Sequence, residues 1–360
     1  MRADALSSIL AEPESLARLS LADWDLIIRQ ARNAQLLARL ERICAEHGWL
    51  EGVPIRARCH LEAARRLCKR QHCEVRWEVD RIKRALAHID TPIVLLKGAA
   101  YVMAGLPPAT GRMFADIDIM VARDRLSDVE SALSAVGWLP EKLDPYDQRY
   151  YRTWGHELPP LRHVVRGTVL DVHHTITQPT SQTPVDPKKL LSEIRPLDIT
   201  GKVFILGQLD LTLHSAAHLF QEGDFDHGLR DLVDFAALVG HFGRAADYWP
   251  ALVERAAELG LGRPLYYTVE QVGRVLRTAM PLSFVKDVNR FRPPLMTKVA
   301  MTSLLRISIR PNHPTCDSRF TSFARWLLFA RAHYIRMPLY LLIPHLVRKG
   351  LRRGAPVAER

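Results

Sequence analysis

The spacing of apolar residues changes twice along this chain, and that change restricts the fold more than any other feature. Up to about residue 88, apolar side chains such as Trp24, Ile27 and Ala31 recur at the period of an amphipathic helix. From Asp90 the apolar runs become short or alternating, as in strands, and from Asp210 the helical period returns. The sequence therefore predicts an α+β protein, in which a small mixed β-sheet core is flanked by N-terminal and C-terminal helical regions.

These changes divide the chain into three predicted regions: a helical region at 1–88, a core at 89–206, and a helical region with a basic tail at 207–360. A length of 360 residues, 48% hydrophobic and 25% charged, is typical of globular proteins and excludes a disordered or collagen-like chain. Neither a long uncharged apolar run nor a basic-then-apolar signal pattern occurs. We therefore expect a cytoplasmic protein.

Four stretches of the core have the composition of strands. They are residues 92–97, 114–121, 164–176 and 199–206. The first ends in Lys97-Gly98, where glycine permits a tight turn into a helix. The second, FADIDIMV, alternates strictly, so that Asp116 and Asp118 share one face of the strand.

Two neighbouring aspartates on one face form the most informative pattern in the chain. Their carboxylates repel each other unless a cation lies between them. Asp171, in the alternating segment VLDVH of the third strand, supplies a further carboxylate. Oxygen ligands suit Mg²⁺, and three carboxylates from two strands are able to hold the two Mg²⁺ ions of phosphoryl-transfer chemistry. Asp116, Asp118 and Asp171 are therefore the predicted metal ligands and catalytic residues.

A phosphate-binding pattern precedes the acidic strand. Gly98 allows close approach of the backbone, and the helix that follows offers free N–H groups to an anion. Lys97 adds a positive charge, and Arg112, just before the acidic strand, adds another. Lys97, Gly98 and Arg112 are the predicted contacts of a bound triphosphate.

Three segments carry a resemblance to known enzymes. LLKG (95–98), GRMFADIDIMV (111–121) and LDVHH (170–174) look like the DNA polymerase β-type nucleotidyltransferase superfamily. Within it, the chain is similar to the family of uncharacterised bacterial nucleotidyltransferases. The resemblance extends from about Trp24 to His345 and includes weaker helical motifs such as HSAAH and LRDLVDFA.

This resemblance implies a function and roles for the residues that carry it. It implies transfer of a nucleoside monophosphate from a nucleoside triphosphate, with ATP the expected donor, to an acceptor hydroxyl with the help of two Mg²⁺ ions. By resemblance, the turn at Gly98 contacts the triphosphate, Asp116 and Asp118 ligate metal, and Asp171 completes the triad. The identity of the acceptor does not follow from it.

Two other functions stay open at this point. A non-catalytic nucleotide-binding or interaction module is favoured by Ala99, which follows Gly98 where the superfamily usually has Gly or Ser. The second is binding of an anionic partner, because residues 290–360 contain 14 Lys and Arg but only two acids. Such a region favours nucleic acid, an acidic glycan or a membrane surface. Its last stretch, 337–353, has the pattern of a basic amphipathic helix.

Several polar groups have both a functional and a structural interpretation. They are the close set Cys59, His60, Cys68, His72 and Cys73, the pairs His173–His174 and His214–His218, and the group Arg230, Asp231 and Asp234. The first set suggests zinc, but only Cys68 and Cys73 approach the spacing of zinc ligands. His214 and His218 share a helix face without the glutamate of a metalloprotease motif. For all of these groups we favour the structural interpretation.

Overall fold

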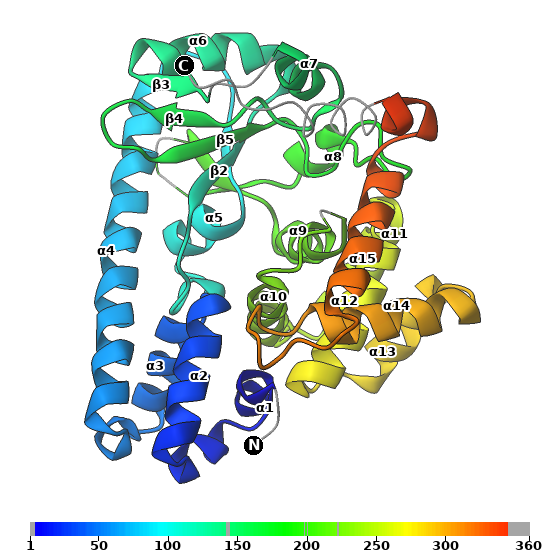
Figure 1. Cartoon of the computed structure of the whole chain (residues 1–360). Coiled ribbons are helices and arrows are strands. Elements are labelled where there is room, and N and C mark those ends of the chain that lie inside the picture. Colours follow the sequence, from blue (N-terminus) through cyan, green and yellow to red (C-terminus); the bar gives the residue numbers. More distant parts are fainter. Residues whose placement is uncertain (1–3, 142–144, 198, 200, 222, 345–360) are drawn as a thin grey trace, which may run out of the picture.

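The computed structural model describes residues 4–141, 145–197, 199, 201–221 and 223–344 (Figure 1). In this part of the chain a seven-stranded mixed sheet lies between an N-terminal and a C-terminal set of helices. The α+β fold predicted from the apolar spacing is thus confirmed. No helix in the described ranges is long and apolar enough to cross a membrane.

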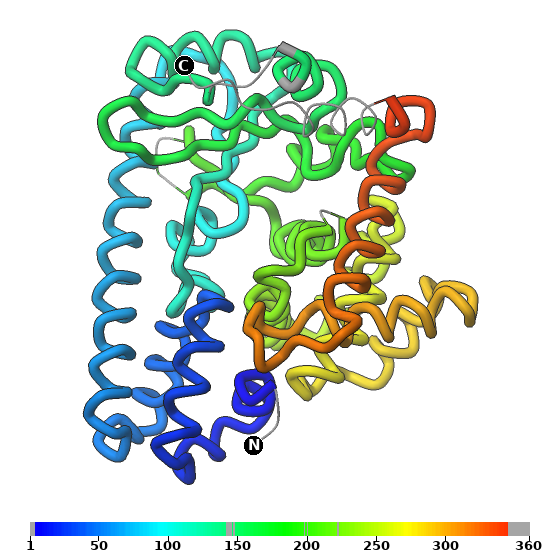
Figure 2. The backbone as a smooth tube through the Cα atoms, in the orientation of Figure 1, coloured from blue at the N-terminus to red at the C-terminus, as the bar shows by residue number. Residues whose placement is uncertain are grey.

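The N-terminal helices precede the sheet. They are α1 (Ala5–Ala11), α2 (Leu21–Asn33), α3 (Leu37–Glu46) and α4 (Ile55–Ala85), with 3₁₀ turns at Pro13–Arg18 and Leu50–Gly52. A capping box starts α2, because Ser20 and Asp23 each accept a hydrogen bond from the other's backbone N–H. The 31-residue α4 extends from these helices to the sheet (Figure 2). Of the apolar residues that the sequence places on one stripe of this helix, Leu61, Ala64 and Ile82 are buried, whereas Leu67 is 47% exposed.

The sheet has the strand order β3-β4-β5-β2-β1-β7-β6. The strands are β1 (Ile93–Leu95), β2 (Asp116–Met120), β3 (Trp138–Pro140), β4 (Leu161–His163), β5 (Val169–His173), β6 (Arg195–Pro196) and β7 (Val203–Ile205). The pairs β2–β5 and β1–β7 are parallel, and the other pairs are antiparallel. The predicted strands correspond to β1, β2, β5 and β7. The sequence did not predict β3, β4 and β6, which have only two or three residues each.

Helices and turns within the core connect these strands. They are α5 (Lys97–Met103), α6 (Leu126–Ala135), α7 (Pro145–Trp154) and α8 (Pro187–Leu191), with 3₁₀ turns at Pro107–Ala109 and Arg123–Arg125. Ile117 and Ile119 of β2 are at most 2% exposed and anchor the strand in the core. Alternation along β2 therefore turns Asp116 and Asp118 to the opposite face.

The C-terminal region is helical. It contains α9 (Gln208–Gln221), α10 (Gly228–Phe242), α11 (Tyr248–Glu258), α12 (Gly262–Gln271), α13 (Leu282–Val288), α14 (Leu295–Ser308) and α15 (Thr321–Arg336), with a π turn at Val272–Leu276 and a 3₁₀ turn at Asn289–Phe291. The orange-red α15 packs against α9 and returns to the core (Figure 1). There the Thr180 hydroxyl donates to the Arg336 carbonyl at 2.7 Å, and the Gln182 N–H donates to the Ile335 carbonyl at 2.9 Å. Of the predicted tail helix, residues 345–353 lie outside the described part of the chain.

Candidate active site

A cavity of about 330 Å³ lies over the face of the sheet that carries the aspartates. Its wall comes from the turn after β1, strands β2 and β5, the segment around residues 150–157, helix α9, and the end of α15. We call it the carboxylate cavity. Its polar lining includes Lys97, Asp116, Glu157, Asp171, His218 and Arg336.

The pairing of β2 with β5 brings the three predicted carboxylates together. These strands are parallel, and their register places Asp118 directly beside Asp171. Asp116 lies two residues earlier on β2, on the same face, and is exposed at the cavity mouth. Asp118 is only 4% exposed. The sequence therefore identified a group of acids that the fold does collect in one place.

Asp118 is held by two positively charged or proton-bearing groups. The Lys97 ammonium lies 3.2 Å from Asp118 Oδ1, and His173 Nε2 lies 2.9 Å from the same oxygen. Burial alone would raise the pKa of Asp118, but Lys97 and His173 together hold it below its ordinary range. Asp118 is thus ionised across the physiological pH range.

The pKa of Asp171 is shifted in the opposite direction from that of Asp118. Burial, followed by the negative charges of Asp118 and Glu157, raises the pKa of Asp171 to about 8. Its Oδ1 atom is buried and makes no hydrogen bond. Partial burial in the cavity wall and the charge of Asp118 also raise the pKa of Asp116. An orphaned carboxylate oxygen among like charges fits a divalent cation, so the residues present suit the Mg²⁺ ions predicted from the sequence.

The turn after β1 places Lys97 over these carboxylates. Lys97 has a φ of 43°, a left-handed conformation that is uncommon for a residue with a side chain and often occurs at functional sites. Gly98 is required for a different reason from the predicted one. A Cβ at Gly98 would lie 2.1 Å from the ring of Phe114, so the glycine makes room for that ring. Gly98 itself is buried and does not line the cavity.

Arg112 lies beside the site rather than in it. Its guanidinium forms an ion pair with Asp234 of α10 and stacks near the rings of Tyr101 and Phe114. The side chain is buried and is not part of the cavity wall. The structure therefore does not bring Arg112 to the place where the sequence predicted a phosphate contact, and the reason is the buried acid on α10.

Helix α10 supports a histidine of the cavity wall. Asp231 Oδ2 lies 3.5 Å from His218 Nδ1, and Asp231 also pairs with Arg230. Burial would raise the pKa of Asp231, but Arg230 and His218 hold it below its ordinary range. The structural role that we favoured for Arg230, Asp231 and Asp234 therefore also affects the site, because Asp231 orients His218, which lines the cavity.

Sequence reasoning missed Glu157 and His156, which also line the cavity. The segment 156–158 pairs antiparallel with the end of β5, where the Leu158 N–H donates to the Val172 carbonyl at 2.9 Å. This pairing brings Glu157 Oε2 to 3.3 Å from His173 Nδ1. The spacing of residues in the sequence does not predict the contact between Glu157 and His173, because this contact depends on pairing between separate segments. His173, which the sequence had placed next to Asp171, is 2% exposed and is enclosed by acids.

Two of the suspected zinc residues of α4 lie in contact, with Cys68 Sγ 3.4 Å from His72 Nε2. Cys59 and Cys73 are exposed, and Cys68 is buried. The Cys68 thiol lies 3.3 Å from the carbonyl oxygen of Arg112 and donates to it. Among the described residues, none of this set belongs to a group of three metal-ligating side chains.

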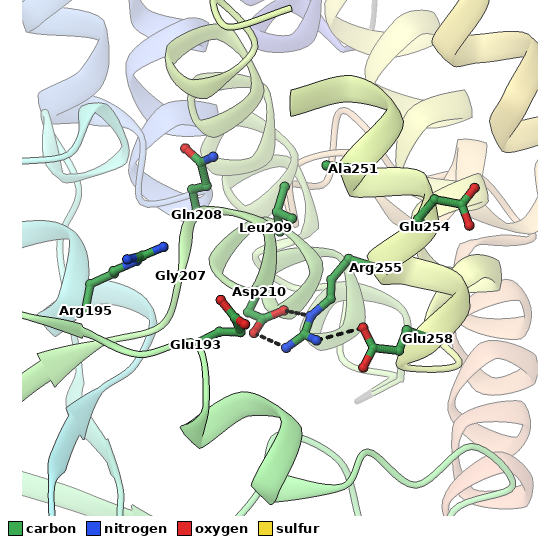
Figure 3. A pocket seen from close by; sticks show the side chains of 10 residues that line it. All are labelled: Glu193, Arg195, Gly207, Gln208, Leu209, Asp210, Ala251, Glu254, Arg255 and Glu258. Atoms are coloured by element: carbon green, nitrogen blue, oxygen red, sulfur yellow. Dashed lines mark hydrogen bonds and ion pairs between the residues drawn. The ribbon is translucent and has the colours of Figure 1, made fainter. Parts of the chain in front are cut away.

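A larger cavity, about 570 Å³, lies between the segment 193–195, the start of α9 and helix α11 (Figure 3). We call it the arginine cavity, because Arg255 bridges it. Arg255 donates to both carboxylate oxygens of Asp210, at 2.7 and 2.8 Å, and to Glu258 at 2.8 Å. None of the residues predicted for the site lines it. Size alone therefore does not mark the chemical centre of this molecule.

Comparison with known sequences identifies the family of this chain. The profile of a family described as uncharacterised nucleotidyltransferases matches residues 20–277. The chain belongs to that family. The matched region includes every residue of the cavity except those contributed by the end of α15. Neither a curated protein nor a solved structure gives a significant match.

Proposed function

We propose that this protein is a Mg²⁺-dependent enzyme of the DNA polymerase β-type superfamily that transfers a nucleoside monophosphate from a nucleoside triphosphate to an acceptor hydroxyl. The observation that carries the proposal is the in-register pair Asp118 and Asp171 beside Asp116, with an orphaned oxygen on Asp171. Membership of the nucleotidyltransferase family supports the same reaction. ATP remains the expected donor.

The three aspartates have separate roles in this proposal. Asp116 and Asp118 hold both Mg²⁺ ions, and Asp171 joins them at the ion nearer the acceptor. When bound, the ions polarise the α-phosphoryl group and lower the pKa of the attacking hydroxyl. The Asp171 carboxylate would then accept the proton of the acceptor hydroxyl as a general base.

Three basic side chains of the cavity wall are the proposed triphosphate contacts. Lys97 lies over Asp118, His218 is oriented by Asp231, and Arg336 enters from the end of α15. Positive charge at the cavity offsets the charge that develops on the leaving pyrophosphate. Lys97 also weakens the repulsion among the acids while the cavity lacks ions.

The position of Arg336 changes how the basic C-terminal region is interpreted. The described part of that region does more than form a separate basic surface, because α15 ends at the carboxylate cavity. We propose that one anionic partner of this region is the triphosphate itself. Nucleic acid, an acidic glycan and a membrane surface remain candidate partners of the other basic residues.

Product analysis tests the proposed reaction. The protein is incubated with Mg²⁺, each nucleoside triphosphate in turn and a host-cell extract, and products are searched by mass spectrometry for an added nucleoside monophosphate. Pyrophosphate release is measured in parallel. We expect both products from wild type and neither from Asp118→Asn, with unchanged circular dichroism. Triphosphate binding without any product would favour the non-catalytic module, and absence of triphosphate binding would reject both.

A further inference from the structure

Three side chains that the triad does not use form a compact group at one side of the carboxylate cavity. His156, Glu157 and His173 each offer one ligand atom, and these atoms all lie within 4.8 Å of one another. Glu157 Oε2 is 3.3 Å from His173 Nδ1 and 3.9 Å from His156 Nε2. The group shares the cavity with the aspartates but contains none of them.

These separations are close to those around a bound cation. Ligand atoms about 2.0–2.2 Å from a tetrahedral ion lie about 3.3–3.6 Å apart. The backbone fixes two of the three side chains relative to each other, because residue 157 pairs with residue 173 across an antiparallel bridge. Small rotations of side chains on a fixed backbone are therefore sufficient to close the group around an ion.

His173 provides the second observation. It is 2% exposed, and its Nδ1 atom makes no hydrogen bond. Its other nitrogen, Nε2, lies 2.9 Å from Asp118 and donates to it. A histidine that ligates a metal commonly donates its other ring N–H to a carboxylate, which fixes the tautomer and directs the free lone pair at the ion. Asp118 and His173 have this arrangement, with Nδ1 lying 3.3 Å from Glu157 Oε2.

We infer that His156, Glu157 and His173 form a second divalent-cation site, chemically distinct from the aspartate triad, that takes a transition metal such as Zn²⁺ or Mn²⁺. Two imidazole nitrogens and one carboxylate oxygen are donors that Zn²⁺ and Mn²⁺ accept, whereas Mg²⁺ prefers oxygen ligands alone. The ion also supplies positive charge next to four carboxylates: those of Asp116, Asp118, Asp171 and Glu157. The inference goes beyond the proposed function, because the site needs no nucleotide.

Pulsed electron paramagnetic resonance of the full chain loaded with Mn²⁺, without nucleotide, tests this site. Coupling to ¹⁴N reports imidazole bound to Mn²⁺, and the aspartate triad cannot produce it. We expect ¹⁴N coupling in wild type and its reduction in His156→Gln. Glu157→Gln should weaken Mn²⁺ binding at least about tenfold. Stoichiometric Zn²⁺ should displace the coupled Mn²⁺, and excess Mg²⁺ should not.

His333→Gln is the matched control, since His333 lines the same cavity without belonging to the group. It should keep the ¹⁴N coupling of wild type. Should the variants fail to fold, the wild-type spectrum and its titration with Zn²⁺ decide alone. A wild-type spectrum without ¹⁴N coupling overturns the inference and shows that His173 only connects Asp118 to Glu157 by hydrogen bonds.

The outcome is distinguishable from that of the proposed function. In one outcome, Mn²⁺ binds only with a triphosphate, binding is lost in Asp118→Asn, and the spectrum lacks ¹⁴N coupling. That outcome would retain the nucleotidyltransferase proposal and overturn this site. In the other outcome, Mn²⁺ shows ¹⁴N coupling but the protein transfers no nucleotide, which would retain this site and overturn the nucleotidyltransferase proposal.

Discussion

The carboxylate cavity and the arginine cavity each contain a deeply buried aspartate, but they differ in how completely their buried carboxylates are paired. Asp210 is 1% exposed, and Arg255 contacts both of its oxygens (Figure 3). Asp118 is 4% exposed and contacts Lys97 and His173, but the adjacent Asp171 has a buried carboxylate oxygen that makes no hydrogen bond. The buried aspartate of the arginine cavity is therefore fully paired, whereas the carboxylate cavity retains an unpaired one.

The difference shows where a ligand is needed. A buried ion pair that is complete leaves no charge for a ligand to neutralise, however large the adjoining cavity is. Like charges left together raise one another's pKa and favour any cation that enters. The carboxylate cavity is the smaller of the two, at about 330 against 570 Å³, but of these two cavities it is the one with a buried carboxylate oxygen that makes no hydrogen bond, Asp171 Oδ1. An unpaired buried carboxylate is thus a better guide to the site than the volume of a cavity.

The largest effect expected from this contrast is on catalysis. Asp118→Asn removes the carboxylate that both Mg²⁺ ions need, and nucleotidyl transfer should fall by at least about a thousandfold, as when a principal source of transition-state stabilisation is lost. The unfolding free energy should fall, because Lys97 and the buried His173 lose the carboxylate that both contact. Single-turnover rates and urea unfolding measure the two effects. Activity within tenfold of wild type would contradict the proposed triad.

Stability should respond most at the arginine cavity. Asp210→Asn leaves Arg255 buried without its main partner, which costs about 3–5 kcal/mol in comparable cases. Glu258 still contacts Arg255, so the loss should lie near the lower end of that range. Urea unfolding of Asp210→Asn beside Asp171→Asn checks this. A larger loss in Asp171→Asn than in Asp210→Asn would reverse the comparison.

The sequence predicted the acids of the site better than its bases, for a physical reason. Alternation along a strand is local, so Asp116 and Asp118 were placed on one face without any knowledge of the sheet. Arg112 lies near them in sequence, but its guanidinium pairs with the buried Asp234 on the distant α10. This pairing determines the position of its positive charge. Glu157 reaches the site by pairing across the sheet. Contacts of this kind depend on the assembled fold.

The same distinction holds for the fold as a whole. Long helices such as α4 and the alternating strand β2 have periods that are visible in one window of sequence. The short strands β3, β4 and β6 acquire their structure from the strands beside them, so the sequence contains no period to detect. Gly98 illustrates a partial success, since the tight turn was predicted but the ring of Phe114 that requires the glycine was not.

A smaller effect is expected in the pH dependence of stability without metal. The pKa of Asp171 is raised to about 8 in the folded state, so the folded protein binds a proton that the unfolded chain has lost. Its contribution is complete below the unfolded pKa and disappears as the pH rises through about 8. The melting temperature in chelator should therefore fall between about pH 5 and 8.

Two controls identify the group responsible. Asp171→Asn should flatten this profile, although Asp116 and His173, whose pKa values are also raised, leave part of the slope. Mg²⁺ with a triphosphate should stabilise wild type more at pH 8 than at pH 6, because the ion binds the ionised carboxylate. An Asp171→Asn profile as steep as that of wild type would exclude Asp171 as the source.

The smallest effect concerns the two arginines of the cavities. Arg255 is fixed by Asp210 and Glu258, so Arg255→Ala should act on stability. Arg336, at the end of α15, should act on the donor instead, because its guanidinium lines the carboxylate cavity. Arg336→Ala should raise the KM for the triphosphate about tenfold, equal to about 1.4 kcal/mol, with kcat nearly unchanged. Arg319→Ala, an exposed change in the same basic region, is the control and should leave KM unaltered. Equal KM values for both variants would remove α15 from the donor site and leave its charge to a different anionic partner.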